Sequence, residues 1–373
     1  MSDKPPVEGS PGRLPWPVAS ASPHRLVVAA EGSATFTTIG AALAVAVDGD
    51  EIVVEPGRYV EHLTIGRSIR IEGHGQRERI ILSPPMADAP CITITGGRPH
   101  LTGFTIDARS LDIPDNSEDA RLVRITGGAP VLESLDLAGG MGVLFAGAAT
   151  AGAIRSCAIH DGKGIGILVF LGAAPRIEEN EIWATASNGI EIRDAGSDPL
   201  VRANRIHDGK WFGIYVQAGA APRIEENEIC ANASNGVEIR DAGSNPSVRA
   251  NRVHHDKWNG IYVFLGAAPR IEENEIWANA WAGIAISGAG SDPLVRANRV
   301  HDDKWYGIYV QAGAAPRIEE NEIWATAQPG VEIHGAGGDT SIPSNRIHPG
   351  KWLGIYVHEG ATPRIEGNEI RGE

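Results

Sequence analysis

The sequence predicts an all-β protein wound as a right-handed parallel β-helix, a solenoid of about 12–13 coils with a short N-terminal capping helix. Two observations predict this fold. The phrase PRIEENEI, or PRIEGNEI in its last copy, recurs every 47 residues from Pro175 onward. Within this repeat an asparagine recurs every 23 or 24 residues, and a period of that length is typical of one coil of a solenoid. The asparagines are Asn180, Asn204, Asn227, Asn251, Asn274, Asn298, Asn321, Asn345 and Asn368.

Each coil contains short alternating runs that are typical of β-strands. RIEENEIW (176–183) and GIEIR (189–193) place Ile177, Ile182 and Ile190 on one side of the backbone, and Gly and Pro mark the bends between the runs. The LxxLxL spacing of leucine-rich repeats is missing. We therefore expect three short strands per coil, with successive coils stacked about 4.8 Å apart.

The recurring asparagine has a structural explanation. An inward asparagine at a bend can bond its amide to the backbone and to the asparagines of the neighbouring coils, which satisfies polar groups that would otherwise be unpaired. In the earlier coils Phe104, Leu135 and Cys157 fill the same position, so apolar stacking is expected there. Cys157 is therefore predicted to be a core residue and not a nucleophile.

The chain is expected to form one folded domain after a short arm. The first residues contain six prolines by Pro23, which is typical of disorder. TFTTIGAALAVAV predicts an amphipathic helix that Thr35 begins. The expected divisions are a disordered arm at 1–23 and a β-helix domain at 24–373, with the capping helix at about 35–47, irregular coils at about 51–174 and regular two-coil repeats at 175–373.

Composition excludes several kinds of partner. With 33 Lys+Arg against 47 Asp+Glu, the formal charge is −14, which argues against nucleic acid and anionic membranes. No apolar run reaches membrane-spanning length, and the N-terminus lacks the apolar stretch of a secretory signal, so a cytoplasmic location is expected. The three cysteines form no spaced metal motif, and we expect no cofactor and no metal site.

The motifs resemble those of a known superfamily. A helix followed by IVVEPGRY, and the phrase GIxV…PxIExNxI, are similar to the capped first coil and the coil repeat of right-handed parallel β-helix proteins of the pectin-lyase-like and NosD-like type. The resemblance covers about residues 24–373 and implies the fold. It matches no specific enzyme family: Gly73-His74-Gly75 lacks the accompanying aspartates of polygalacturonases, and HDGK is only partly like the Asp-Pro-His-Asp motif of alginate epimerases.

Most of the repeated charged and aromatic residues are predicted to be structural. The residue after each asparagine alternates between Glu and Arg, as in Glu181 and Arg205, and the residue two before it nearly does the same. Opposite charges one coil apart attract each other, so we expect two charge ladders rather than acid–base pairs. The position three after asparagine alternates between Trp and His, with Cys230 in one coil, and predicts a stack of flat rings.

A ligand-binding surface is predicted on the strand that follows the recurrent glycine. We call it the outward strip: aromatic faces beside carboxylates and amides suit sugar rings, and they suit an extended peptide almost as well. The candidate ligand-binding residues are Tyr215, Tyr262, Tyr309, Tyr356, Trp211, Trp258, Trp305, Arg193 and Arg240.

Glu191 and Glu238 are the candidate catalytic residues of the outward strip. They lie two coils apart, about 10 Å between backbones, so tilted side chains could reach the separation of roughly 6.5–9.5 Å used by inverting glycosidases. The strip departs from its own pattern at Ala285, Ser287 and His334. A second irregularity, the acidic segment 107–120, is expected to flank the strip.

The leading hypothesis is a protein that binds or processes an extended glycan-like ligand along the outward strip. Processing would be of the polysaccharide lyase, hydrolase or epimerase type. The alternatives are a non-catalytic scaffold for protein interaction and a tailoring enzyme that acts on a peptide or small molecule. A homodimer through the C-terminal coil is also expected, because an uncovered coil end exposes unpaired strand edges.

Overall fold

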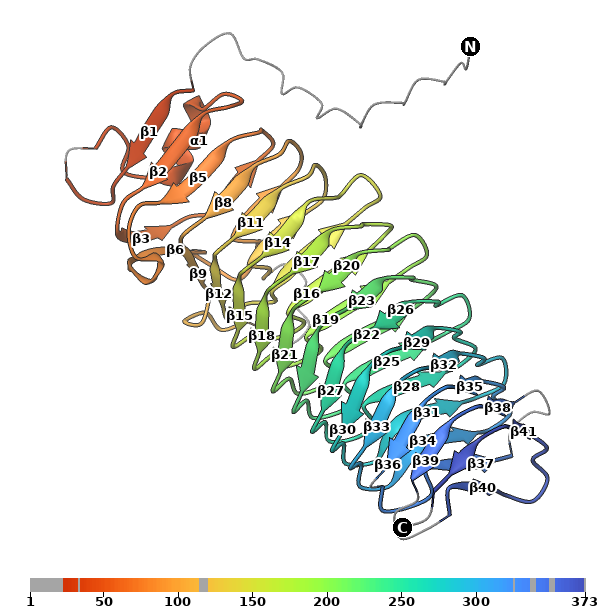
Figure 1. The fold of residues 1–373 in the computed structure, drawn as a ribbon. Coiled ribbons are helices and arrows are strands. Elements are labelled where there is room, and N and C mark those ends of the chain that lie inside the picture. Colours follow the sequence, from red (N-terminus) through yellow and green to blue (C-terminus); the bar gives the residue numbers. More distant parts are fainter. Residues whose placement is uncertain are drawn as a thin grey trace, which may run out of the picture.

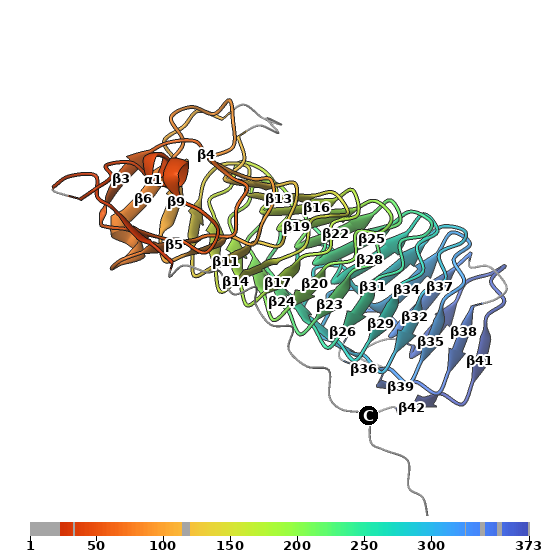
Figure 2. The same cartoon turned by 90° about the horizontal axis from the view of Figure 1, so that it is seen from above.

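The fold is a right-handed parallel β-helix of about 14 turns, built from three parallel sheets (Figure 1; Figure 2). It comes from a computed structural model that describes residues 23–32, 34–113, 120–324, 326–335, 340–348 and 353–371. The predicted fold class is confirmed, and the stack is slightly longer than the 12–13 coils expected from the repeats. Most of the predicted arm and residues 114–119 of the acidic segment lie outside the described residues.

The sheets contain 15, 14 and 13 strands, and we name them A, B and C. Sheet A comprises β1 (Arg25–Val28), β2 (Glu51–Val54), β5 (Arg70–Gly73), β8 (His100–Thr102), β11 (Val131–Glu133), β14 (Ala153–Arg155), β17 (Arg176–Glu178), β20 (Leu200–Arg202), β23 (Arg223–Glu225), β26 (Ser247–Arg249), β29 (Arg270–Glu272), β32 (Leu294–Arg296), β35 (Arg317–Glu319), β38 (Ser341–Pro343) and β41 (Arg364–Glu366). Sheet B comprises β3 (Gly57–Val60), β6 (Ile80–Ser83), β9 (Thr105–Asp107), β12 (Asp136–Ala138), β15 (Ala158–His160), β18 (Glu181–Trp183), β21 (Arg205–His207), β24 (Glu228–Cys230), β27 (Arg252–His254), β30 (Glu275–Trp277), β33 (Arg299–His301), β36 (Glu322–Trp324), β39 (Arg346–His348) and β42 (Glu369–Ile370). Sheet C comprises β4 (Leu63–Ile65), β7 (Ile92–Ile94), β10 (Val123–Ile125), β13 (Val143–Ala146), β16 (Ile167–Phe170), β19 (Ile190–Arg193), β22 (Ile214–Gln217), β25 (Val237–Arg240), β28 (Ile261–Phe264), β31 (Ala282–Ser287), β34 (Tyr306–Gln311), β37 (Val331–His334) and β40 (Ile355–Val357).

A short helix, α1 (Ile39–Val45), covers the N-terminal end of the stack (Figure 1). It begins after Thr38, whose hydroxyl accepts a hydrogen bond from the amide of Ala41 at 3.2 Å. The predicted start at Thr35 is wrong, because Phe36 is held in a parallel bridge with Val28 of β1. A single 3-10 turn (Arg77–Arg79) precedes β6. Within the described residues, no helix is long and apolar enough to cross a membrane.

The corner between sheets A and B is closed by the predicted asparagine column. The residue before each asparagine lies in the left-handed backbone region. Ala250, which precedes Asn251, is an example with φ 55°. Both the backbone amide and Nδ2 of Asn251 donate to Oδ1 of Asn274, at 2.9 and 3.0 Å, and Nδ2 also donates to the carbonyl of Ile224 at 2.9 Å. The same pattern runs from Asn180 to Asn345, and Cys157 is buried at the N-terminal end of the column, as predicted.

A second buried polar column lies at the corner between sheets B and C, and the sequence interpretation missed it. Oδ1 of Asp256 accepts hydrogen bonds from the amide and Nδ2 of Asn232, at 2.8 and 3.0 Å, and the amide of Asp256 donates to Asn279 at 3.1 Å. Asn279 donates to Asp303 in the same way. This column requires glycine opposite it, because a Cβ at Gly236 would lie 2.5 Å from Oδ2 of Asp256.

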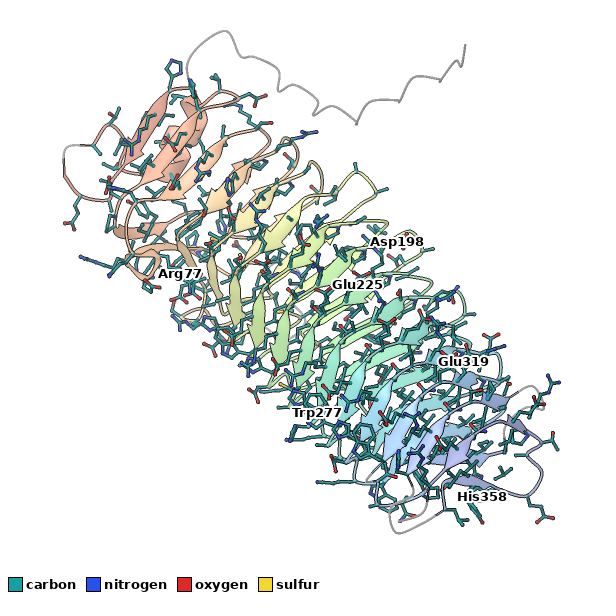
Figure 3. The ribbon with its side chains drawn as sticks, in the orientation of Figure 1. Arg77, Asp198, Glu225, Trp277, Glu319 and His358 are labelled. Carbon is teal, nitrogen blue, oxygen red and sulfur yellow. The ribbon has the colours of Figure 1, made fainter. Side chains whose placement is uncertain are left out.

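The outer faces confirm most of the structural roles predicted for charged and aromatic residues. On sheet B, Arg205 pairs with Glu181 at 2.9 Å, and His and Trp rings alternate in a stack to which Trp277 belongs (Figure 3). The ladder on sheet A is only partly as predicted. Arg202 and Arg249 pair with Glu226 and Glu273, the left-handed residues before the asparagines, instead of with members of their own column.

At the C-terminal end, the core positions of the last strands are open to solvent. Ile365 of β41 and Ile370 of β42 are 42% and 52% exposed. Both strands are the last of their sheets. End-to-end pairing of two chains at this coil stays a prediction.

Removal of one asparagine side chain from the column should destabilise the whole solenoid. Asn251→Ala leaves the amide and Nδ2 of Asn227 without their acceptor and the carbonyl of Ile224 without its donor. We expect the free energy of unfolding, measured by urea denaturation, to fall by about 3 kcal/mol. Ser247→Ala, at a partly exposed position in the same coil, is the control and should change it by less than about 0.5 kcal/mol. Equal effects of the two variants would contradict this role.

The buried aspartates of the second column should make stability depend on pH. Burial raises the pKa of Asp256 well above its ordinary value, so its stabilising contribution is present at low pH and is lost as pH rises through the folded-state pKa. Asp256→Asn keeps an Oδ1 acceptor and removes the titration. We measure the midpoint of thermal unfolding by circular dichroism. The midpoint of Asp256→Asn minus that of wild type should therefore be larger at pH 8 than at pH 4.

The control for this comparison is Asp198→Asn on the exposed surface (Figure 3), for which no such pH-dependent difference is expected. A difference between Asp256→Asn and wild type that stays constant over the same pH range would contradict the prediction.

Candidate functional site

The outward strip predicted from the sequence lies on sheet C. The strand register places its residues in one column across consecutive coils, and carboxylates alternate with tyrosines except at one coil. The carboxylates are less open than an outward position suggests, since Glu191 and Glu238 are only 6% and 7% exposed. The column is Glu191, Tyr215, Glu238, Tyr262, Ala285, Tyr309, Glu332 and Tyr356.

An asparagine three residues earlier holds each of the two candidate catalytic carboxylates. Nδ2 of Asn188 donates to Oε2 of Glu191 at 3.0 Å, and Nδ2 of Asn235 donates to Oε2 of Glu238 at 2.8 Å. The amide and Nδ2 of Asn259, in the next coil, both donate to Oδ1 of Asn235 at 2.9 Å. The asparagines at this turn therefore fix the carboxylates through a hydrogen-bonded network that crosses coils.

The two carboxylates differ in their surroundings. Glu191 also accepts a hydrogen bond from Nε2 of Gln217 at 3.1 Å and has the guanidinium of Arg193 at 3.8 Å. At Glu238, burial raises the pKa to about 7, against the opposing effects of the Asn235 hydrogen bond and the Arg240 charge. A substantial fraction of Glu238 is therefore protonated at neutral pH and can donate a hydrogen bond.

A hollow lies in the outward strip beside a coil that departs from the repeat. Where two equivalent coils carry Asn188 with Glu191 and Asn235 with Glu238, this coil has Ala282 and Ala285, and Trp281 replaces the serine that stands at Ser187 and Ser234. The small side chain of Ala285 lies between Tyr262 and Tyr309 in the register. The hollow has a volume of about 360 Å³ and is lined by Phe212, Ser234, Asn235, Glu238, Trp258, Asn259, Tyr262, Trp281 and Gln311.

Two aromatic rings that line this hollow, Trp281 and Tyr262, pack against neighbouring rings outside its lining. Trp281 meets Tyr309 edge-on, with ring centroids 5.0 Å apart, and Tyr309 stacks on Tyr306 at 4.9 Å. Tyr262 stacks on Phe264 at 4.8 Å. Trp258 is 58% exposed at the edge. The hollow thus combines rigid apolar faces with the carboxyl of Glu238 and the amides of the neighbouring asparagines.

The hollow brings together only some of the predicted site residues. Glu238, Tyr262 and Trp258 line it. The other predicted residues are absent from its lining, and their roles stay predictions: Glu191, Tyr215, Tyr309, Tyr356, Trp211, Trp305, Arg193 and Arg240. Sequence reasoning missed Phe212, Ser234, Asn235 and Asn259 as lining residues, although the joint loss of Asn and Glu at Ala282 and Ala285 marks the coil whose Trp281 lines the hollow.

Two other places in the structure contain polar side chains in a hollow or a cluster. A hollow of about 570 Å³ lies between α1 and β4, but its lining includes no carboxylate, and its arginine, Arg67, donates to the carbonyl of Ala46. At the far end of the strip, His358 (labelled in Figure 3) stacks on His334 with ring centroids 3.7 Å apart and contacts Glu332 at 2.9 Å. Neither place combines aromatic walls with an acidic group in a hollow.

Solved structures with the same fold were found by comparison of the whole chain. The A-module of the mannuronan C-5 epimerase AlgE6 of Azotobacter vinelandii superimposes with a TM-score of 0.57 at 12% identity, covering 89% of this chain and 93% of that one. The periplasmic alginate epimerase AlgG gives 0.55 at 13% identity, with coverage of 86% and 77%. An α-1,3-glucanase of Streptomyces thermodiastaticus gives 0.52 at 14% identity, with coverage of 88% and 64%.

At this level of identity the solved structures show a shared fold. No curated protein is significantly similar to the chain in sequence. The family model described as a right handed beta helix region matches residues 123–253 and 241–373, which together make up more than half of the chain. The stacked parallel sheets and this match agree, and the chain belongs to the right handed beta helix family.

Proposed function

We propose that this protein binds an extended glycan along the outward strip and that one sugar unit of the glycan enters the hollow beside Trp281. The observation that carries the proposal is the hollow itself: aromatic walls and a buried carboxyl meet where one coil departs from the repeat. Aromatic faces beside a few fixed hydrogen-bonding groups are a common design for small-molecule and sugar sites. The fold relatives that act on alginate or α-1,3-glucan support the ligand class.

Binding along the strip would use groups that are already ordered. The Asn188 and Asn235 side chains hold the two carboxylates, and the rings of Tyr262 and Tyr309 are stacked on neighbours. Docking of a ligand therefore costs little conformational entropy of the protein side chains. The regular rise between coils repeats these groups along the strip, which suits a polymer better than a compact molecule.

Processing of the bound glycan is a second candidate function, and the state of Glu238 favours it. A buried carboxyl with a pKa of about 7 is suited to give a proton at neutral pH. Glu191, the partner predicted from the sequence, lies two coils away with Tyr215 between them in the register. In this proposal Glu238 is the acid and Glu191 the base of a hydrolase, lyase or epimerase reaction.

A protein-interaction scaffold is the alternative from the sequence, and the exposed tryptophans bear on it. Trp211, Trp258 and Trp305 are 56%, 58% and 46% exposed. They stand at equivalent positions two coils apart. An even row of this kind would suit an extended peptide, whereas the single hollow beside Trp258 favours a ligand with one distinct docking point.

Glycan binding should depend on Trp258 more than on its equivalent Trp211. Trp258 lines the hollow and Trp211 does not, although their exposure is nearly the same. On a glycan array containing uronate and neutral polysaccharides, Trp258→Ala should weaken binding at least about tenfold, and Trp211→Ala by less than about threefold. The double variant Ala282→Asn with Ala285→Glu restores the repeat in the coil of Trp281, which lines the hollow, and it should also lose binding. The proposal fails if wild type binds no glycan.

Affinity for the glycan should fall as pH rises through about 7. The protonated carboxyl of Glu238 can donate a hydrogen bond to a ligand, and its ionised form cannot. Glu238→Gln keeps a donor that does not titrate, so its affinity, measured by calorimetry between pH 5 and pH 9, should be nearly constant. Glu332→Gln, in the same column and equally buried, is the control and should follow the wild-type profile. Parallel profiles for wild type and Glu238→Gln would refute this role.

A further inference from the structure

The ring stack on sheet B is interrupted at one coil by a cysteine. The register places Cys230 directly between His207 and His254, where the equivalent coils have Trp183 and Trp277. Cys230 is only 6% exposed. This change belongs to sheet B, while the outward strip belongs to sheet C, so the glycan-binding proposal does not account for it.

The loss of the tryptophan leaves three metal-ligating side chains together. Single donor atoms of Glu228, Cys230 and His254 all lie within 4.8 Å of one another. Among the described residues, no other three His, Cys, Asp or Glu side chains come together in this way. Oε1 of Glu228 is 3.4 Å from Nε2 of His254. The three residues come from the adjacent strands β24 and β27, whose rigid pairing fixes their spacing.

His254 is oriented toward this group by contacts on its other sides. Its ring stacks on Trp277, with centroids 4.1 Å apart and an interplanar angle of 18°. Its Nδ1 is 2.8 Å from Nδ1 of His255. Its Nε2 is buried and makes no hydrogen bond of normal geometry within the described structure. When Nδ1 carries the proton and donates it to His255, the lone pair of Nε2 is directed at Cys230 and Glu228.

A second departure from the repeat occurs beside the first. His255 has a left-handed backbone, at φ 58°, where equivalent coils have Asp208 and Asp302. In those coils the aspartate accepts from the histidine at 2.7 Å. The coil with His301 has the same unpaired Nε2 but Trp277 in place of the thiol. Cys230 therefore adds a soft ligand beside a histidine nitrogen that is unpaired both here and at His301.

We propose that Glu228, Cys230 and His254 bind one zinc ion. A thiolate, an imidazole and a carboxylate are the protein ligands that Zn²⁺ accepts, whereas Mg²⁺ and Ca²⁺ prefer oxygen alone. Zinc–ligand distances of about 2.0–2.3 Å require the three donors to move closer than in the metal-free arrangement, which side-chain rotation of Glu228 and Cys230 at the sheet surface allows. A water molecule would complete a tetrahedral set.

The surrounding charges are compatible with a bound cation. Zinc would displace the thiol proton of Cys230 when it binds. Arg205, at 4.0 Å from Glu228, and Arg252, beside His254, are the nearby cations, and Asp208 and Asp256 offset them.

A zinc ion here would brace the coil that carries Glu238. The ion would tie β24 to β27, and the turn that follows β24 leads through Asn232 and Asn235 to Glu238 in β25. The site is therefore structural in this proposal and needs no glycan. Its test is independent of the glycan-binding test.

Zinc binding is tested on the full chain by dialysis with zinc sulfate and then metal-free buffer, followed by metal analysis and thermal unfolding. Wild type should retain one zinc per chain and unfold at a higher temperature than the metal-free protein. Cys230→Trp restores the repeat and should retain none while it folds normally. Cys230→Ser, a smaller change, should lose zinc as well. Cys157→Ala removes a buried thiol outside the group and should retain zinc as wild type does.

Cobalt substitution gives a second, spectroscopic measurement. A cysteine that only packs in the structure and does not bind metal would have no effect on it. Co²⁺ added to metal-free wild type should produce a thiolate-to-cobalt charge-transfer band, and Cys230→Ser should lack it. The proposal is overturned if wild type retains no zinc, if both Cys230 variants retain it as wild type does, or if the cobalt complex shows no thiolate band.

Discussion

The hydrogen bonds between asparagines of successive coils are the interaction on which the rest of this structure depends. Each coil turns from sheet A to sheet B through a left-handed residue, which turns the backbone amide of the asparagine into the interior. The Oδ1 of the next asparagine accepts from that amide and from Nδ2, so the buried polar groups of the corner are satisfied only when the next coil is present. The pairing of sheets B and C, and hence the position of every outward side chain, follows from this corner.

Most of the fold could be predicted because one period governs it. The interior isoleucines, the asparagine column and the ring stack all follow from residues that recur at fixed spacing. The start of α1 could not be predicted, because the bridge between Phe36 and Val28 is a tertiary contact. The column with Asp256 was missed because its position holds Thr, Gly, Asn or Asp in different coils, so no single letter marks it.

The strand that carries the candidate site could be predicted from the sequence, but not all of the residues that line the hollow could. The alternation of Glu and Tyr identifies the outward strip, and its break at Ala285 marks the coil whose Trp281 lines the hollow. Phe212 and Gln311 line the hollow from distant coils, and their direction depends on side-chain packing that the repeat does not encode. The burial of Glu238 was also unforeseen, since an outward strand position usually implies solvent. The hollow on sheet C and the group around Cys230 on sheet B both lie where a coil departs from the repeat.

The alternation of glutamate and arginine on sheet B also determines how many coils such a chain can gain or lose at one time. Loss or gain of a single coil would keep the asparagine column continuous but would bring Glu181 beside Glu228, or Arg205 beside Arg252. Loss or gain of two coils preserves both the interior hydrogen bonds and the attraction across the surface. Duplication by 47 residues is therefore the smallest change that the solenoid accepts without electrostatic conflict. Length can vary in this unit while the coils with the hollow and with Cys230, which depart from the repeat, remain single.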